Sequence, residues 1–257
     1  MANLSPIEGD YVVGKGMLFF QKSGVTKWEE IGDIDGFSIS QDLTRLERFS
    51  NQYGVRTKTD SRINQQNQTI SFTLFQMTAR NRALGLLSDV AYLTQSAVTG
   101  QSITFEDVEV GGIYHVGKYD LNIDSINGEN TAATPYVEGT NYEVDVQAGI
   151  VKVLAIPGGV SDMVVHYDAA AIVTGTKRLN AGIGSAPDLA GALMFRGVNS
   201  TGRQVEVMLH DVRLAPSGER QYISDEYSSI QIEGEIIADS DQATGYEIGW
   251  ERDLTTG

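Results

Sequence analysis

Apolar and polar residues alternate in several segments of the chain, a pattern typical of strands with one buried face. Phe37 and Ile39 alternate with serines, and Ile70, Phe72 and Leu74 alternate with serine and threonine. The same pattern recurs near the C-terminus, at Ile230, Ile232 and Ile236 and at Tyr246, Ile248 and Trp250. The chain is therefore predicted to be mainly β.

One predicted strand changes the parity of its apolar positions. In "VEVMLHDVRL", residues 205–214, the apolar set keeps one parity up to Leu209 and resumes with the other at Val212. One extra residue in a strand turns the following side chains to the other face. The pattern therefore predicts a β-bulge at His210–Asp211.

A single segment has the periodicity of a helix. Thr78 can cap the start of "ARNRALGLLSD", in which Ala79, Ala83 and Leu87 recur every four residues with Leu84 beside them. The segment directly follows a predicted strand. We expect this helix to lie across the open face of that strand's sheet.

The distribution of charge divides the chain into parts. Residues 41–90 hold seven bases and four acids, a balance of +3, whereas residues 103–172 hold two bases and eleven acids, a balance of −9. The acidic part has strands of its own, because "TNYEVDVQAGIVKVLA" predicts two strands around a turn at Ala148–Gly149 and "SDMVVHYDA" predicts another. We predict an acidic β subdomain at 103–172, inserted into a core formed by 1–102 and 173–257.

Composition excludes several classes of protein. The chain has 257 residues, no cysteine and a formal net charge of −15, so disulfides and thiolate metal sites are ruled out and tight binding to nucleic acid is disfavoured. No apolar stretch approaches the roughly 18 residues of a membrane span, so no membrane binding is expected. The first residues, "MANLSPIEGDYVVGKG", lack the features of a signal peptide. We expect the protein to fold in a cytoplasm.

The usual signatures of catalysis and ligand binding do not occur. "DLNIDSINGE" begins like a calcium loop, but Ser125 stands where glycine is required and Thr131 where glutamate is required. "VVGKGMLFF" has Phe19 at the third glycine position of a nucleotide-binding motif. The three histidines are isolated in sequence: His115, His166 and His210. We predict no catalytic residue, no cofactor and no metal site, and therefore no enzyme.

One basic, amide-rich segment contrasts with the acidic chain. In "FSNQYGVRTKTDSRINQQNQ", Phe49–Gln68, the cations Arg56, Lys58 and Arg62 face only the acid Asp60. Taken alone, the segment could be a nucleic-acid loop or a solvated hairpin. The net charge of the chain makes the nucleic-acid interpretation costly.

Four blocks of sequence carry a family resemblance when they are taken in order. "VGKGMLFFQKSGVTKWEEIGDIDGFSIS" is similar to a first hairpin with a W-x-x-I/L-G-x-I/V segment, and "LERFSNQYGVRTKTDSR" to an extended arm before a strand, here Thr69–Met77. "YVEGTNYEVDVQAGIVKVLA" is similar to a block between two core halves, and "LMFRGVNSTGRQVEVMLHDVRLAPSGERQYISDEYSSIQIEGEIIAD" to a C-terminal half. Together they resemble the major tail (tail tube) proteins of long, non-contractile-tailed bacteriophages.

The resemblance implies a tail-tube-type β-sandwich or partial barrel with one short flanking α-helix and an inserted β subdomain. Such subunits form hexameric rings that stack into a tube through which genome DNA passes transiently and without sequence preference. The implied partners are other copies of the chain, a tape measure protein, a tail terminator and a distal tail protein. The implied location is the virion tail, after folding and assembly in the host cytoplasm.

Two expectations concern the surfaces of such a tube. Acidic strand faces would line the lumen so that DNA makes few contacts, and the subdomain at 103–172 would face outward. We also predict that Tyr53, Arg56, Lys58 and Arg62 form the contact between rings, with the cations reaching carboxylates of the adjacent ring.

Two other classes of protein compete with this hypothesis. An immunoglobulin-like or adhesin-type binding module would also consist of β subdomains, and it would remain a stable monomer. A β-sandwich glycosidase is disfavoured because no pair of carboxylates can be placed.

Overall fold

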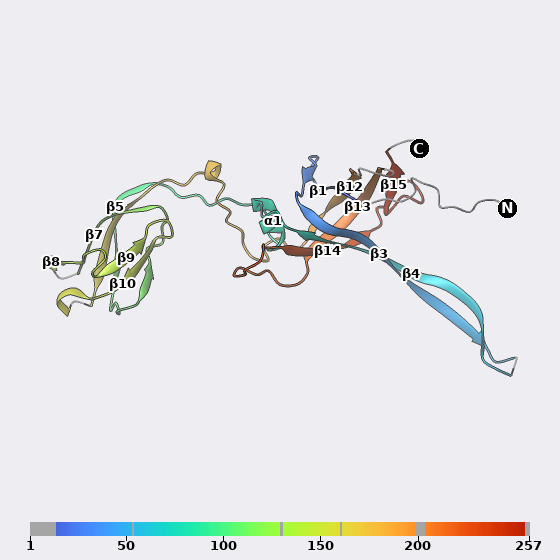
Figure 1. The fold of residues 1–257 in the computed structure, drawn as a ribbon, viewed down its shortest axis with the longest axis horizontal. Helices are drawn as coiled ribbons and strands as arrows, with labels where there is room; N and C mark the ends of the chain where they lie inside the picture. The colour runs from blue at the N-terminus through green and yellow to red at the C-terminus, as the bar shows by residue number, and fades with distance from the viewer. Residues whose placement is uncertain (1–13, 53, 129–130, 160, 199–203, 255–257) are drawn as a thin grey trace. The chain divides into compact units, whose positions relative to one another are not determined.

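Antiparallel strands provide nearly all the regular structure of the protein (Figure 1). The structure is a computed structural model that describes residues 14–52, 54–128, 131–159, 161–198 and 204–254. The chain divides into two units, each with its own hydrophobic core. Unit 1 comprises Met1–Val90 and Ala181–Gly257, and unit 2 comprises Ala91–Asn180. The prediction of a mainly β chain is confirmed.

Unit 1 contains one eight-stranded sheet with the order β2-β1-β12-β13-β14-β4-β3, in which β15 also pairs with β13. Its strands are β1 (Gly16–Lys22), β2 (Glu29–Glu30), β3 (Ile34–Ser50), β4 (Thr57–Leu74), β12 (Leu189–Gly197), β13 (Val205–Pro216), β14 (Ile230–Ile237) and β15 (Gly249–Asp253). Phe37 of β3 stacks on Phe195 of β12 with ring centroids 5.3 Å apart, although the two strands are not neighbours in the sheet. The sheet therefore curls over its own core, as in a sandwich.

The predicted bulge in β13 is confirmed. Gly191 pairs with Val212 and Leu193 pairs with Leu209, so one residue of β12 lies opposite the two residues His210–Asp211. This offset allows both Leu209 and Val212 to be buried in the core.

Strand β15 begins later than the sequence predicts. It starts at Gly249, so Tyr246 and Ile248 precede it. The backbone N–H of Tyr246 donates to the carbonyl of Ala243 in a turn, which removes it from the strand ladder. Ile248 still packs against the core.

Helix α1 (Ala79–Leu84) starts where the sequence predicts and ends earlier. The hydroxyl of Thr78 accepts a hydrogen bond from the backbone N–H of Asn81 at 3.1 Å. Leu84 is buried in the core of unit 1, so the helix packs against the apolar face of the sheet. Leu87 has a positive φ of 50°, which stops the helix before the end of the predicted segment.

Unit 2 contains two small sheets. One has the order β5-β11-β7-β8 and the other has the order β6-β10-β9. Their strands are β5 (Val98–Phe105), β6 (Ile113–His115), β7 (Leu121–Gly128), β8 (Thr131–Pro135), β9 (Tyr142–Asp145), β10 (Ile150–Val153) and β11 (Met163–Ala169). Two short 3-10 turns, Pro157–Gly159 and Thr174–Thr176, complete the unit.

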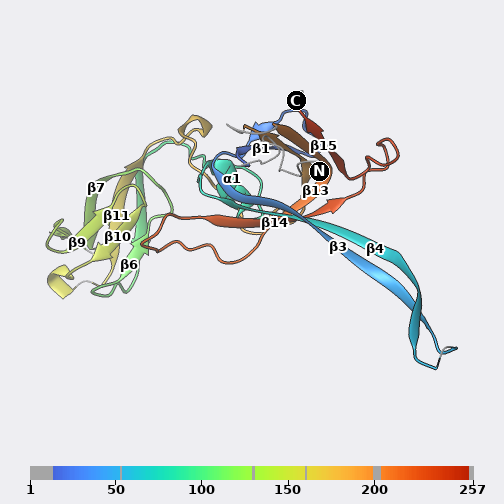
Figure 2. The same cartoon turned by 45° about the vertical axis from the view of Figure 1, so that its right-hand side comes forward.

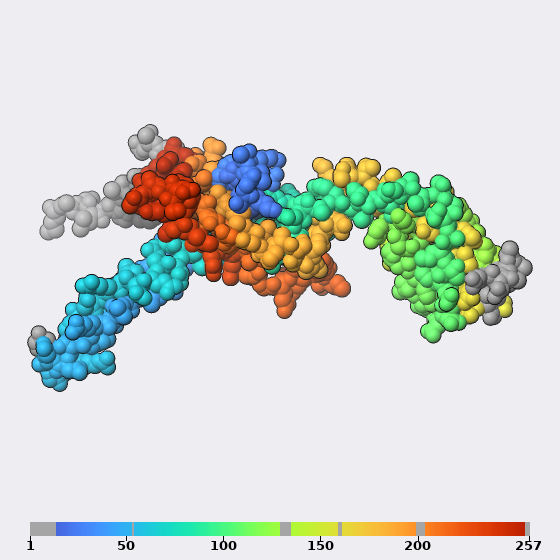
Figure 3. Space-filling model, turned by 180° about the vertical axis from the view of Figure 1, so that it is seen from behind, coloured from blue at the N-terminus to red at the C-terminus, as the bar shows by residue number. Residues whose placement is uncertain are grey.

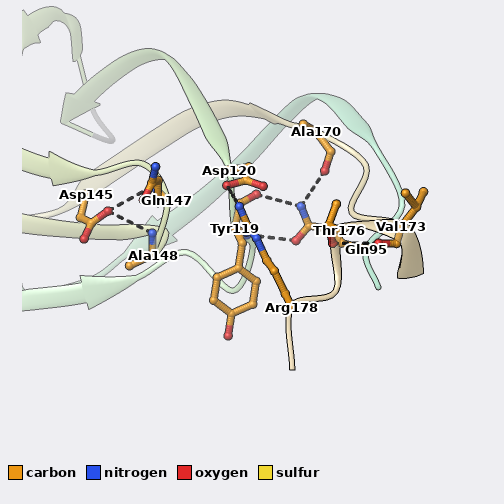
Figure 4. A network of polar contacts seen from close by, with 10 residues as sticks. All are labelled: Gln95, Tyr119, Asp120, Asp145, Gln147, Ala148, Ala170, Val173, Thr176 and Arg178. Atoms are coloured by element: carbon orange, nitrogen blue, oxygen red, sulfur yellow. Dashed lines mark hydrogen bonds and ion pairs between the residues drawn. The ribbon is translucent and has the colours of Figure 1, made fainter. Parts of the chain in front are cut away.

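The turn predicted at Ala148–Gly149 is confirmed, and its chemistry is visible in Figure 4. The carboxylate of Asp145 accepts hydrogen bonds from the backbone N–H groups of Gln147 and Ala148, each at 3.1 Å. Gly149 has a φ of 70°, a conformation that glycine adopts without strain. The turn joins β9 to β10.

Hydrogen bonds tie the entry and exit of the chain into unit 2 (Figure 4). The side-chain amide of Gln95 donates to the carbonyls of Tyr119 at 2.8 Å and Ala170 at 2.9 Å. Arg178 forms an ion pair with Asp120 at 2.9 Å. Unit 2 therefore extends farther at both ends than the predicted 103–172. The predicted bounds came from the change in charge along the chain, and these side-chain contacts do not appear in composition.

None of the helices in the described part of the chain has the length and apolar composition that crossing a membrane requires.

Candidate interaction site on the β3 and β4 hairpin

Strands β3 and β4 form a hairpin whose outer part extends beyond the rest of the sheet (Figure 2). Strand β14 pairs with β4 only as far as Gln68, so residues 42–67, which we call the arm, are flanked by no other strand in the described chain. Nearly every described residue of the arm is exposed. Figure 3 shows the arm, in blue and cyan, projecting from unit 1.

The arm corrects the sequence prediction for this segment. An extended arm was expected before a strand at Thr69–Met77, with a solvated hairpin as the alternative, and the structure shows a hairpin. Strand β4 begins at Thr57 and ends at Leu74, and the basic segment forms most of its outer half. The other half of the arm is the outer part of β3, where the alternation of apolar residues predicted a strand only as far as Ser40.

The pairing register gives the arm two different faces. Residues directly opposite each other in an antiparallel pair share a face. Ile39 lies opposite Ile70, a core residue, so the core-facing side of β3 and β4 continues outward along the arm. We call this side the apolar face, and its exposed apolar residues are Ile39, Leu43, Phe49 and Ile63.

Two bulges in β4 maintain the apolar face along the whole arm. The register skips Asn64 and then Thr59, so each is an extra residue opposite β3. Each bulge reverses the parity of β4. As a result, Ile63 lies opposite Arg45 and Lys58 lies opposite Phe49, on the same side as Ile39.

The opposite side, which we call the polar face, carries mainly hydroxyl, amide and charged groups. Near the base of the arm, the hydroxyls of Ser38 and Ser71 lie 2.9 Å apart on this side. Gln65 donates to Asn67 at 3.0 Å farther out. Leu46 is the exposed apolar exception. The apolar face, by contrast, carries Leu43, Phe49 and Ile63 among Arg45, Glu47, Lys58, Ser61 and Gln66, and neither face is covered within the described chain.

The structure distributes the predicted contact residues over the arm. Lys58 lies on the apolar face and forms an ion pair with Glu47. Arg62 lies on the polar face, with its Nε 3.1 Å from a carboxylate oxygen of Asp60.

Arg56 lies at the tip of the arm, where its guanidinium stacks over the ring of Phe49, 4.9 Å from the centroid. Tyr53 lies outside the described residues. Exposed ion pairs contribute only about 0.2–1 kcal/mol each, so the cations of the arm can exchange their present partners for those of another molecule. Their role between copies stays a prediction.

Sequence reasoning missed the apolar face. Ile39, Leu43 and Phe49 do alternate with the same parity along β3, and this was the available signal. Arg45 and Glu47 occupy the same parity and interrupt it.

The solvent side of the sheet in unit 1 is acidic and rich in hydroxyls next to the arm. Glu233 and Glu235 of β14 lie opposite Ser71 and Thr69 of β4. The neighbouring cation, Arg213, is held by carboxylates, 2.5 Å from Asp188 and 3.5 Å from Asp211. The hydrogen bond to Asp188 raises the pKa of the Arg213 guanidinium, so the side chain stays protonated. Its positive charge is balanced by the two carboxylates beside it.

No group of three or more His, Cys, Asp or Glu side chains in the described ranges is arranged to hold a metal ion. The arm combines exposed cations with exposed apolar side chains, and it is therefore the candidate interaction site.

Comparison with known proteins identifies a family. The model of a family described as "Protein of unknown function UCP028589" matches residues 11–250, which span both units. No curated protein matches the chain.

Proposed function

The chain belongs to this family of unknown function, and we propose that its role is structural: copies assemble into rings that stack into the tail tube of a long, non-contractile-tailed bacteriophage. The tube forms a channel through which the genome passes into the host. The resemblance of the sequence motifs to tail tube proteins supports a tail tube as the assembly. The proposal of six subunits in each ring rests on that resemblance alone.

The observation that carries the proposal is the arm. A two-stranded hairpin is at best marginally stable by itself, and ordering each residue of its backbone costs about 1–2 kcal/mol. Residues 42–67 nevertheless extend beyond β14 and present an apolar face to solvent. A surface of another copy would cover this face and stabilise the arm.

The edges of the sheet support assembly into rings. Strand β3 is 17 residues long, and no described strand pairs with its outer edge. At the other end of the sheet order, β2 has two residues and leaves most of the outer edge of β1 unpaired. Exposed edges of this kind favour pairing with further strands, and joining them around a ring satisfies their backbone groups.

The acidic, hydroxyl-rich solvent side of β14 and β4 supports a channel for DNA. Glu233 and Glu235 repel phosphate, and the hydroxyls of Ser71 and Thr69 between them offer only weak neutral contacts. A lumen with this surface would let a polyanion slide without binding. Unit 2 would face outward, and the tape measure, terminator and distal tail proteins would be the other partners.

Size-exclusion chromatography with light scattering, followed by negative-stain microscopy, tests the proposal. The purified chain is expected to form rings or tubes. A variant with Arg56, Lys58 and Arg62 all changed to Glu should fold and yet fail to form long tubes. The matched control reverses three cations of unit 2, Lys118, Lys152 and Lys177, and should still assemble.

A binding module of the immunoglobulin-like or adhesin type is the second candidate. The separate hydrophobic core of unit 2 favours it, since a module with its own core can fold independently. A chain that remained monomeric at all concentrations would support this candidate and overturn the tube.

A further inference from the structure

The loop between β13 and β14, residues 217–229, exposes large apolar side chains. Ile223 is 96% exposed and Tyr227 is 94% exposed, and Tyr222 is exposed as well. Isolated apolar residues on a surface are common, but several on one loop mark an interaction site. The loop also holds three acids against one base: Glu219, Asp225 and Glu226 against Arg220.

A surface hollow of about 680 Å³ lies where this loop meets the end of β4. It is lined by two aromatic residues, Phe75 and Tyr227, and by two acids, Asp225 and Glu226. Phe75 is exposed, directly after the last residue of β4. The hollow is thus suited to an apolar group that carries a cation.

The tip of the arm has this chemistry. Arg56 stacks over Phe49, and Val55 beside it is exposed. The arm holds five bases and three acids, a balance of +2, whereas the loop has a balance of −2. The two surfaces therefore complement each other in charge and in apolar character.

The tip of an arm cannot reach the hollow of its own copy. The hollow lies at the Leu74 end of β4, because Ile230, which follows the loop, pairs with Leu74. The tip lies at the Thr57 end of the same strand. At about 3.3 Å per residue, the two ends are roughly 55 Å apart. Figure 2 shows the loop side of β14 and the arm tip at opposite ends of the hairpin.

We propose that the arm tip of one copy docks into the hollow of the next copy. Phe49 and Val55 pack against Phe75 and Tyr227, while Arg56 forms ion pairs with Asp225 and Glu226. The inference rests on the proposed function, since it requires that copies assemble, and it adds the surface that receives the arm.

This contact joins two different surfaces at opposite ends of one strand, so it is heterologous and leaves a free tip and a free hollow after every addition. Such a contact closes a ring where the rotation between copies closes, and otherwise it builds an open filament. Because the proposed ring uses the unpaired edges of the sheet, we assign the tip-to-hollow contact to the stacking direction of the tube.

A charge exchange tests the proposal. Arg56→Glu and Glu226→Arg should each raise the concentration needed for assembly by about tenfold, because each places like charges together. The double variant restores the pair and should assemble within about threefold of the original protein. Lys177→Glu, which makes the same change of charge in unit 2, should have no effect.

A disulfide test identifies the contact directly, because the natural chain has no cysteine. A chain with both Val55→Cys and Ser224→Cys, oxidised after assembly, should give a ladder of covalent oligomers on a non-reducing gel. A chain with Val55→Cys and Lys177→Cys is the control and should give no ladder. Circular dichroism of each variant confirms that it is folded.

The outcomes separate the two hypotheses. If the original protein forms tubes while the charge exchange has no effect and the ladder is absent, the tip docks elsewhere and the tube proposal stands. If the original protein never assembles, the tube proposal fails and the docking contact fails with it.

Discussion

The inner and outer halves of strand β4 continue the same two faces of the sheet in opposite environments. In the inner half, Gln68–Leu74, every second side chain is buried, whereas in the outer half, Thr57–Asn67, every side chain is exposed. Ile70 is 1% exposed and Ile63 is 54% exposed, although the register places both on the same face.

The difference follows the neighbours of β4 as well as its sequence, which is polar in the outer half apart from Ile63. Strand β14 accompanies β4 as far as Gln68, and the core of unit 1 ends there. Beyond that point the apolar face continues without cover. The outer half thus keeps one apolar residue, Ile63, on the face that the core covers farther in, and no described element of the chain covers it.

The largest expected effect distinguishes the two isoleucines. Ile70→Ala should lower the free energy of unfolding of unit 1 by about 3 kcal/mol, because it leaves a cavity in the core. Ile63→Ala should lower it by less than about 0.5 kcal/mol in the unassembled chain. Urea unfolding followed by tryptophan fluorescence measures both, since Trp28 and Trp250 are the only two tryptophans and both belong to unit 1. Equal losses of unfolding free energy for the two variants would show that Ile63 is as well packed in one copy as Ile70.

The next effect concerns assembly and tests which face of the arm is covered. Ile63→Glu places a charge on the apolar face and should raise the concentration needed for assembly by about tenfold, equivalent to about 1.4 kcal/mol. Leu46→Glu places the same charge on the polar face and should change it much less. Sedimentation of assembled material over a concentration series measures both. A larger effect at Leu46 would show that the faces are assigned the wrong way round.

A smaller effect is expected at the inner end of β4, where the chain continues into helix α1. Thr78→Ala removes the acceptor for the Asn81 N–H and should destabilise unit 1 by about 1 kcal/mol. Thr78→Ser retains a hydroxyl and serves as the control. The same urea titration applies. An unchanged urea midpoint for Thr78→Ala would mean that the Thr78 N-cap does not stabilise the start of helix α1.

The smallest effect is expected in the outer half. Lys58→Ala breaks the exposed ion pair with Glu47 and should destabilise the unassembled chain by less than about 0.5 kcal/mol. Adding salt should abolish the difference between Lys58→Ala and the original protein, because salt screens exposed charges. A loss above about 1 kcal/mol would indicate that the arm is stabilised within one copy.

Much of unit 1 could be predicted from the sequence where one face of an element is buried. The parity change between Leu209 and Val212 gave the bulge in β13, and Thr78 gave the start of α1. Both signals exist because a core residue must point inward and because a helix end needs an acceptor.

The arm was not predictable in the same way. Alternation records burial within one chain, and the outer halves of β3 and β4 are not buried in one chain. The bulges at Asn64 and Thr59 further hide the period by reversing parity twice. Charge and amide content marked the segment as unusual, but composition carries no information on strand pairing. The acceptor hollow depends on the pairing of Ile230 with Leu74, residues far apart in sequence.

The two bulges also restrict how the arm can change its length. Inserting or deleting a single residue in β3, or between the bulges, would turn every side chain beyond that point to the other face. A change in β3 would then move Phe49 from the face on which Ile39 lies, and a change between the bulges would move Lys58 from it. Related chains with longer or shorter arms are therefore expected to differ by pairs of residues in each strand, or to lose or gain a bulge together with a single residue.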